Sequence, residues 1–531
     1  MPLGAVFTKP AMSNAAFTKA APNGDRFRTP LRRSCREMAV HRSRAFVQRW
    51  WAWRVALVAG VALGVASCLV GCGRRGGSAL LPRDTNIVIC VLDAARPDHM
   101  GCYGYPRSTT PTIDKLAAQS LVFENHFAAA TYTETSTASL FTSQHPYTHL
   151  VLATTGNVGI GKSSFTLARG LAEVGYSTAL FSSNPFVAAK EGMAPDFQEV
   201  YGLDEVAPDA TQGEARYAPE HLLRSFDGWL RRSQTKPFFA YLHLLVPHVP
   251  YHAPDRFTTL FQGKTPPDYR PEDYHPGRYG VPIGAQSQSH PALPEWINLY
   301  DANMRYADWA VEQIAGALKK AAIFDSTLLI ITADHGEAFG EHGYTMHAGA
   351  IHSEVSHIPL IIRFPGNRRV ARISRLTQNT DLLPTILELV GAEYPRDSVE
   401  GSPLVTVLPG QAAKRRDYVF TYARPDQSCP LDTSKYMVRG EDYSLLLYEN
   451  GKWRALYDLK ADPGEKHNII ADQPEAAEQT LAAFREFAKQ QAKPPLHFAD
   501  ASAPPPSIPR RRDRQMTPQM EKELKALGYL K

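Results

Sequence analysis

Cysteine is scarce in this sequence, which has six in 531 residues. The cysteines form no CxxC pair and show no disulfide framework, which excludes a zinc site of paired cysteines and a small disulfide-stabilised fold. Cys90 lies in an apolar strand pattern and is expected to be a small core residue. Cys102 and Cys429 could pair, although nothing in their spacing indicates that they do.

A strong excess of one charge is also lacking, since the net charge is +5. Much of the basic excess lies in the first 75 residues and in Arg510, Arg511, Arg512 and Arg514. This distribution gives little support to nucleic-acid binding. Hydrophobic residues make up 44% and charged residues 21% of the chain, as in ordinary globular proteins, so wholesale disorder is excluded. The length allows a sizeable core and more than one domain.

One apolar stretch without a charge, Val55 to Gly71, follows an N-terminal region rich in Arg and Lys. It is at the short limit for a membrane span and has the order of a signal peptide. LVGC at 69–72 resembles the lipobox of bacterial lipoproteins, in which the cysteine, here Cys72, is lipidated. The alternative is an uncleaved single-helix membrane anchor. Either way, we expect residues 1–72 to direct export and to tether the protein to the bacterial cell envelope, as a periplasmic or outer-membrane lipoprotein or through one span.

After a Gly- and Arg-rich linker at 73–85, apolar runs alternate with helix-like segments up to about residue 400. Each expected strand is apolar on both faces, which indicates an α/β sheet covered by helices on both sides. We assign residues 86–400 to this domain. The expected strands are 86–92, 177–181, 237–245, 327–332 and 359–364, and the expected helices are 112–118, 165–174, 219–232 and 300–321.

The pattern changes near residue 400, where short strand candidates follow one another at 418–422, 436–438, 443–448 and 453–458. Asn450-Gly451 is a strong hairpin signal between the last two. A helix-like segment follows at 474–491. We therefore predict a smaller antiparallel sheet with a helix over 401–492. Residues 493–516 are expected to be irregular, and a final helix is expected after Thr517-Pro518, within a tail at 493–531.

Two expected strands end in possible metal ligands. Asp93 ends the first strand, and Asp334 and His335 end the strand at 327–332. In open α/β sheets ligands collect beyond the carboxyl ends of the strands. Carboxylate and imidazole ligands together suit a divalent cation. Asp93 alone could equally be a helix cap or an ion-pair partner of Arg96.

A hydroxyl-rich segment, TYTETSTASLFTS at 131–143, precedes a helical pattern, so that a side chain near Thr133 would lie at a helix N-terminus. The free N–H groups and the helix dipole there favour an anion such as phosphate or sulfate. Ordinary capping by Thr or Ser is the commoner reason for such residues.

Short motifs continue along the chain, beginning with DAARPDHMGCYGY at 93–105. The further motifs are TTP at 109–111, IDKLA at 113–117, PHVPY at 247–251, YDA at 300–302, YAD at 306–308, DHGE at 334–337, GEHG at 340–343, IPLIIR at 358–363, YDL at 457–459, DPGE at 462–465 and LGYL at 527–530. In content and order they resemble the sulfatase family of the alkaline phosphatase superfamily, over nearly everything after residue 85. The resemblance implies an alkaline phosphatase/sulfatase-like α/β/α sandwich with a smaller C-terminal antiparallel sheet plus helix.

The resemblance also implies roles for individual residues. Asp93, Asp334 and His335 match the metal ligands, and Thr133 matches the nucleophile that also touches the metal. One divalent ion is implied, with Zn or Mn preferred because of the histidine ligand, and Ca or Mg possible.

His248 and His347 match groups that contact the ester oxygens or protonate the leaving group, although each could instead be a structural histidine. His149, His342 and His352 are expected to be structural.

The sequence departs from the family pattern at the nucleophile. Sulfatases proper carry Cys-x-Pro-x-Arg, whose cysteine becomes formylglycine, whereas this chain has TETST at 133–137. Formylglycine is thereby excluded, and Thr137 replaces the arginine that would bind the ester. Ala94 stands where typical sulfatases have a second carboxylate for calcium.

Three functions stay open at this stage. The first is a metal-dependent hydrolase of sulfate or phosphate esters acting through Thr133, with a small-molecule, lipid or glycan substrate. The second is a phosphoethanolamine- or phosphoglycerol-type transferase or a phosphodiesterase, because those relatives use threonine. The third is a sulfatase-fold binding protein without activity.

Overall fold

The sequence NIVICVL forms β1 (Asn86–Leu92), which lies inside an eight-stranded sheet of order β10-β2-β9-β6-β1-β5-β3-β4. β1 runs parallel to both of its neighbours, β5 and β6, whereas β9 is antiparallel to β2 and β6. The other strands are β2 (Leu121–Phe127), β3 (Ser177–Ser182), β4 (Glu199–Tyr201), β5 (Phe238–Leu244), β6 (Thr327–Thr332), β9 (Leu360–Arg363) and β10 (Ala371–Gln378). All five strands expected in this domain are present.

This computed structural model describes residues 80–152, 159–188, 192–206, 217–232, 237–266, 293–347, 349–404, 416–425, 433–449, 451, 454–500 and 502–503. They belong to one compact unit, Gly76–Lys531. No helix within these ranges is long and apolar enough to cross a membrane. The leader at 1–72, Cys429 and the helix expected after Pro518 lie outside the described residues and stay predictions.

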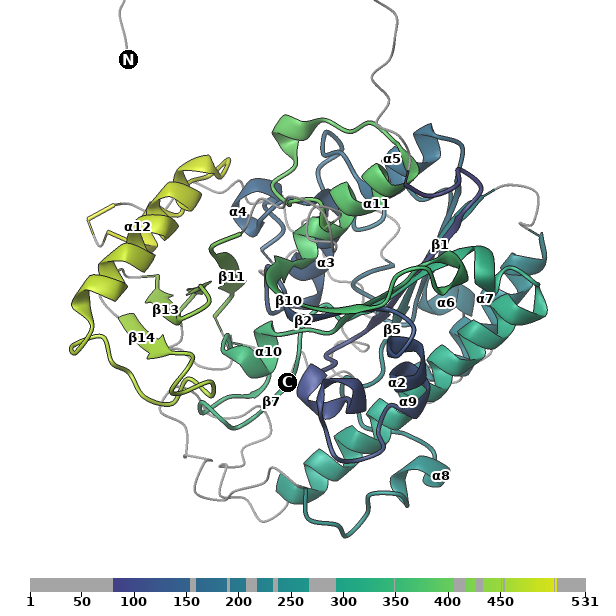
Figure 1. Cartoon of the computed structure of the whole chain (residues 1–531), viewed down its shortest axis with the longest axis horizontal. Coiled ribbons are helices and arrows are strands. Elements are labelled where there is room, and N and C mark those ends of the chain that lie inside the picture. Colours follow the sequence, from purple (N-terminus) through teal and green to yellow (C-terminus); the bar gives the residue numbers. More distant parts are fainter. Residues whose placement is uncertain are drawn as a thin grey trace, which may run out of the picture. The chain divides into compact units, whose positions relative to one another are not determined.

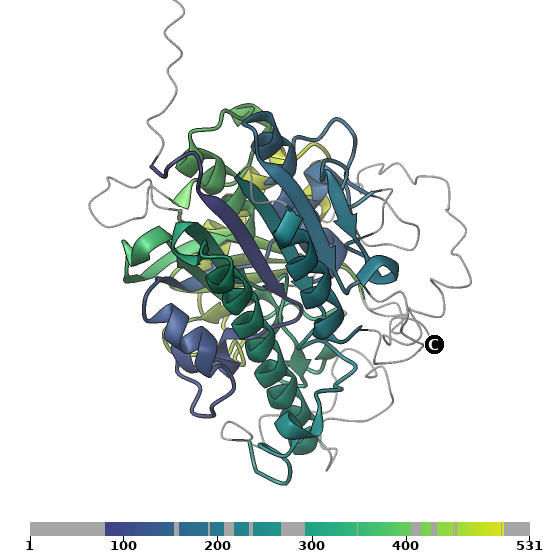
Figure 2. The same cartoon turned by 90° about the vertical axis from the view of Figure 1, so that its right-hand side faces the viewer.

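Side chains alternate along β1 between two hydrophobic layers. Val88 and Cys90 join the layer built with α2 (Pro111–Ala117), α7 (Pro219–Arg232) and α9 (Leu293–Lys320). Ile87 and Ile89 join the layer built with α3 (Thr133–Thr142), α5 (Leu167–Glu173) and α11 (Leu382–Val390). The two groups of helices cover opposite faces of the sheet (Figure 1, Figure 2), which confirms the predicted α/β/α arrangement.

The helix expected at 300–321 begins before residue 300. α9 starts at Leu293, because Leu293 and Ile297 are buried and extend its apolar stripe by almost two turns. The remaining short elements are α4 (Pro146–His149), α6 (Leu203–Val206), α8 (Asp255–Thr258), α10 (Ser353–Ser356), β7 (Ala338–Phe339) and β8 (Thr345–Met346).

The C-terminal region forms the predicted small antiparallel sheet. Its strands are β11 (Val419–Ala423), β12 (Lys435–Arg439), β13 (Tyr443–Tyr448) and β14 (Arg454–Asp458), paired in that order. Helix α12 (Pro474–Gln490) packs Leu481 and Phe484 against this sheet. The segment after 492 was expected to be irregular, but Leu496–Phe498 form a 3-10 turn that buries Phe498 in the same core.

The small sheet is hydrogen-bonded to the segment that leads into α3. Tyr422 of β11 donates its N–H to the carbonyl of Ala129 (2.9 Å) and accepts from the N–H of Thr131 (3.1 Å). Ala130 and Tyr422 thereby form a parallel bridge. The C-terminal sheet is therefore attached two residues before Thr133.

Candidate active site

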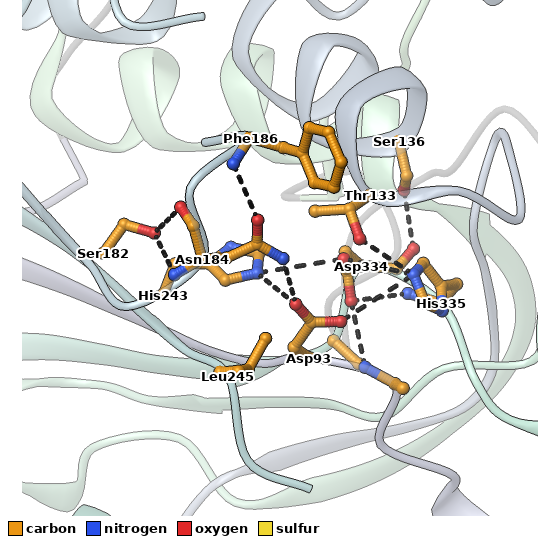
Figure 3. A network of polar contacts seen from close by, with 12 residues as sticks. Asp93, Thr133, Ser136, Ser182, Asn184, Phe186, His243, Leu245, Asp334 and His335 are labelled. Atoms are coloured by element: carbon orange, nitrogen blue, oxygen red, sulfur yellow. Dashed lines mark hydrogen bonds and ion pairs between the residues drawn. The ribbon is translucent and has the colours of Figure 1, made fainter. Parts of the chain in front are cut away.

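The predicted ligands meet at the carboxyl end of the central strands. β1 and β6 are parallel, with Val91 opposite Thr332, so the residues that follow them emerge at the same edge. The Nε2 atom of His335 lies 3.8 Å from Oδ1 of Asp93 and 3.5 Å from Oδ2 of Asp334 (Figure 3). All three residues are buried.

Thr133 joins this group as the first residue of α3. Its Oγ1 lies 3.1 Å from Nε2 of His335, and its side chain is fully buried. The residue before it, Tyr132, is the N-cap, and among the described residues no side chain caps this helix. The hydroxyl of Thr133 therefore faces the ligand group instead of serving as a cap. Ser136, one turn later, donates to the carbonyl of Asp334 (2.6 Å) and fixes the helix over the strand end.

The proton of His335 is placed by its backbone partner. Nδ1 of His335 lies 2.9 Å from the carbonyl oxygen of Gly336, which can only accept, so Nδ1 carries the hydrogen. Nε2 then presents its lone pair toward Thr133 and the two carboxylates. This is the tautomer that a metal-ligating histidine requires.

His248 and His347 lie beside His335. The ring centroid of His347 is 4.2 Å from that of His335 and 5.0 Å from that of His248. Nδ1 of His248 donates to the carbonyl of Val249, and Nδ1 of His347 lies 3.1 Å from Oε1 of Glu337. In each ring Nδ1 is occupied by its hydrogen bond, so Nε2 is the atom that can exchange a proton with a substrate.

Two partners of Asp93 were not predicted. Nδ2 of Asn184 lies 2.7 Å and Nε2 of His243 lies 3.1 Å from Oδ2 of Asp93. His243 lies in β5, next to β1 in the sheet, and an imidazole in the buried strand FFAYLHL was a signal that could have revealed it. Asn184 follows β3 and has no comparable signal in the sequence.

The three histidines expected to be structural have structural contacts: His149 bonds Ser139, and His342 bonds Glu354 and stacks on His352.

Electrostatics favour a charged Asp93. Burial acts to raise its pKa, but electrostatic interaction with His248, the hydrogen bond and charge of His243, and electrostatic interaction with His335 outweigh burial and hold the pKa at about 2. Burial acts to lower the pKa of His243, but the Asp93 hydrogen bond and the charges of Asp93 and Asp334 raise it. Burial and the neighbouring His335 and His248 hold the pKa of His347 well below its usual value.

The residues present fit a divalent cation. Oδ1 of Asp93 and Oδ2 of Asp334 are buried and accept no hydrogen bond from any described residue. One ligand atom each of Asp93, His243 and Asp334 lie within 4.8 Å of one another. Buried carboxylate oxygens without a donor are unfavourable unless a cation compensates them. Ala94 adds only its backbone N–H, which donates to Oδ1 of Asp334 (3.2 Å).

Comparisons with known proteins show the family to which the chain belongs. A family model described as Sulfatase matches residues 85–392, more than half of the chain, and one described as N-sulphoglucosamine sulphohydrolase, C-terminal, matches residues 340–493. The chain is 23% identical over 437 residues to a Delta 4,5-hexuronate-2-O-sulfatase of Bacteroides thetaiotaomicron, covering 77% of this chain and 88% of that protein. It is 26% identical over 479 residues to the multifunctional alkaline phosphatase superfamily protein PehA of Trinickia caryophylli, covering 74% and 92%.

A solved structure has the same fold. The phosphonate monoester hydrolase of Agrobacterium radiobacter superposes with a TM-score of 0.60 at 22% identity, covering 80% of this chain and 100% of that one. The Sulfatase model runs from the start of β1 to the end of α11 and so includes the strand ends that carry Asp93, Asp334 and His335. This chain belongs to the sulfatase family of ester hydrolases.

Proposed function

We propose that this protein is a metal-dependent hydrolase of sulfate or phosphate esters, with a preference for phosphate esters, and that Thr133 is its nucleophile. The observation that carries the proposal is the convergence of the Thr133 hydroxyl, Nε2 of His335 and the unpartnered oxygens of Asp93 and Asp334 within one buried group. A hydroxyl beside a cation site is the arrangement that nucleophilic ester hydrolysis needs.

The ion would be held by Asp93, Asp334, His335 and Thr133. His243 is the described residue best placed either to orient Asp93 by its hydrogen bond or to serve as a further ligand. A bound divalent ion would lower the pKa of the Thr133 hydroxyl and offset the negative charge of the ester. Zn or Mn fits better than Ca or Mg, because imidazole nitrogen is a ligand in the group.

The bond changes follow from the positions of the side chains. The Thr133 hydroxyl gives its proton to Nε2 of His248 or His347, whose rings lie beside that of His335, while Oγ1 bonds to phosphorus or sulfur and the bond to the ester oxygen breaks. The same histidine then passes this proton to the departing alkoxide. Water attacks the Thr133 ester in the second step: its hydroxyl stays on phosphorus or sulfur, and its other proton passes through the histidine to Oγ1, which releases phosphate or sulfate and restores the hydroxyl.

The identity of the nucleophile favours phosphate. A threonine ester has no route to collapse to a carbonyl, so a second in-line attack must resolve it. Attack by an alcohol in place of water would transfer the group, which is the transferase alternative.

The test is a panel of phenyl phosphate, bis-(4-nitrophenyl) phosphate and phenyl sulfate with wild type, Thr133→Ala and Thr133→Ser. We expect Thr133→Ala to lower kcat by ~10³-fold or more, and Thr133→Ser to keep measurable activity. Intact-protein mass spectrometry after rapid quenching should show one added phosphoryl group on the wild type and on Thr133→Ser, and none on Thr133→Ala.

Activity that survives Thr133→Ala would exclude this nucleophile. Turnover of phenyl sulfate alone would contradict the preference for phosphate, and product formed only with an added alcohol acceptor would identify a transferase.

A further inference from the structure

Helix α3 provides no positive charge at the ester site. Thr137, one turn after Thr133, occupies the place of the arginine in sulfatases proper, and its side chain is buried. An arginine reaches the nucleophile segment instead from the C-terminal sheet.

β11 delivers an arginine to this place. Tyr422 is paired with Ala129 and Thr131, and the two segments run parallel. Two residues beyond Tyr422 lies Arg424, which is therefore level with Tyr132. The guanidinium carbon of Arg424 lies 3.5 Å from the centroid of the Tyr132 ring, which is a close cation–π stack.

The stack lies beside His347. The ring centroid of Tyr132 is 5.8 Å from that of His347, which in turn is 4.2 Å from that of His335. Ring contacts through Tyr132 and His347 thus connect Arg424 to His335. Its positive charge contributes to lowering the pKa of His347 and opposes the burial that raises the pKa of Glu134, in agreement with this position.

Phe186 forms the other apolar part of this region, with its ring centroid 6.2 Å from that of Tyr132. Tyr132 has an extended backbone, so its side chain and that of Thr133 leave the chain in different directions. The reacting phosphorus or sulfur must lie at Thr133 and His335, whereas the alcohol part of the ester must extend past the proton donors. The Arg424–Tyr132 pair lies on that second path.

We propose that Arg424, stacked on Tyr132, forms a subsite for a second anionic group on the alcohol part of the substrate, such as a carboxylate. This inference rests on the proposed function of the site. A planar guanidinium matches a carboxylate in a bidentate way, and stacking on an aromatic ring orients it at little entropic loss. The natural substrate is then an ester of an acidic alcohol.

The experiment compares matched probes: phenyl phosphate against 4-carboxyphenyl phosphate, and phenyl sulfate against 4-carboxyphenyl sulfate. Wild type should show a kcat/KM at least ~10-fold higher for the carboxylated member of the pair that it hydrolyses. Arg424→Gln should reduce this ratio to about one by lowering kcat/KM for the carboxylated probe more than for the plain probe, and Arg424→Lys should give an intermediate ratio. Arg372→Gln, at an exposed arginine of β10 paired with Glu124, is the matched control and should keep the wild-type ratio.

Binding measurements show which of the two proposals fails, the Arg424 subsite or the proposed hydrolase function. Calorimetry with Thr133→Ala should show tighter binding of 4-carboxyphenyl phosphate than of phenyl phosphate, and the preference should vanish in the double variant Thr133→Ala/Arg424→Gln. Preference in binding without turnover by wild type would overturn the proposed function alone. Equal binding of the two probes would overturn the subsite. An equal loss for both probes in Arg424→Gln would also overturn it, because Arg424 would then bind the reacting group.

Discussion

At the scale of single residues, the two oxygens of Asp93 have different tasks. Oδ2 accepts hydrogen bonds from Asn184 (2.7 Å) and His243 (3.1 Å), whereas Oδ1 faces His335 with no donor among the described residues. Such outer hydrogen bonds fix the direction of a ligand before the ion binds and tune its affinity. The hydrogen bonds to Oδ2 hold the carboxylate in place, so that Oδ1 faces the proposed ion site.

Asp334 allows the cation site to be tested without disturbing the fold. Oδ1 of Asp334 accepts from the N–H groups of Ala94 and His335, and an amide oxygen can keep both bonds, whereas the unpartnered Oδ2 becomes an NH₂ group in Asp334→Asn. We expect the variant to lose metal, measured by elemental analysis of the purified protein. For wild type, adding ion at about 100-fold over its Kd should stabilise the fold by about 2.7 kcal/mol, seen as a rise in Tm that chelator reverses.

The Tm of Asp334→Asn should not respond to ion or chelator. Asp325→Asn, at an exposed aspartate paired with Arg363, is the control and should keep the wild-type response. Stoichiometric metal in Asp334→Asn would contradict the ligand assignment.

The sequence predicted which candidate ligands lie together better than it predicted the residues that contact them. Asp93, Asp334 and His335 follow apolar strands, and a strand end is visible in the pattern of residues. Asn184 and Glu337 are needed only because of where the fold places Asp93 and His347, and such long-range hydrogen bonds leave no local signal. The same holds for Arg424, whose position depends on pairing between segments almost 300 residues apart.

At the scale of elements, α3 is held over the site from its first turn. The hydroxyl of Ser136 donates to the carbonyl of Asp334 (2.6 Å) and accepts from Nδ2 of Asn379 (2.9 Å). Ser136→Ala should destabilise the protein by about 1–3 kcal/mol, because a buried carbonyl loses its donor. It should also lower kcat more than it raises KM, since the start of α3 positions Thr133, and metal content should stay at the wild-type value.

Thr142→Ala is the matched control in the same helix. Its hydroxyl donates to the carbonyl of Ala138 inside α3, so the first turn should be unaffected and kcat should be retained. Steady-state kinetics and urea unfolding of both variants decide the matter. Equal effects on kcat would show that the first turn has no special part in positioning Thr133.

Helices and strands were predictable from the sequence where the hydrophobic periodicity and the length of a segment indicated the same element, and not elsewhere. The bounds of β1, α7 and β6 match the expected ranges residue for residue. β2 was not predicted, because LVFENHF has three polar residues in its second half, and β10 was not predicted, because arginines interrupt ARISRLTQ. Both strands are formed by pairing with each other and, for β2, with β9, and not by a local pattern.

At the scale of the whole described body, the C-terminal sheet is joined to the larger domain at a second place besides β11. One carboxylate makes this junction. Oε2 of Glu465 accepts from the backbone N–H (2.9 Å) and hydroxyl (2.8 Å) of Ser353 in α10, and Oε1 accepts from Arg439 (2.6 Å) and Ser444 (2.6 Å) of the small sheet. Both junctions help to hold β11, and hence Arg424, in position.

The pKa of Glu465 determines how we expect the stability of this junction to depend on pH. Burial acts to raise the pKa of Glu465, but the charges of Arg439 and His352 and the Ser444 hydrogen bond lower it to about 2 from an ordinary value of 4.5. A carboxylate with a lower pKa in the folded state stabilises the fold fully above its unfolded pKa, and this stabilisation is lost as the pH falls from about 4.5 to about 2. A shift of this size corresponds to about 3 kcal/mol at neutral pH.

Glu465→Gln should therefore lower the free energy of unfolding by about 3 kcal/mol or more at pH 7, because Arg439 also loses its buried partner. The difference from wild type should shrink steadily in urea unfolding at pH 5, 4 and 3.5. Glu478→Gln, at an exposed glutamate near Arg454 and Arg485, should change stability by less than about 1 kcal/mol at every pH. A difference that is constant from pH 7 to 3.5 would show that Glu465 acts through packing and not through its charge. In that case the junction would hold β11 in place at any pH at which the protein is folded.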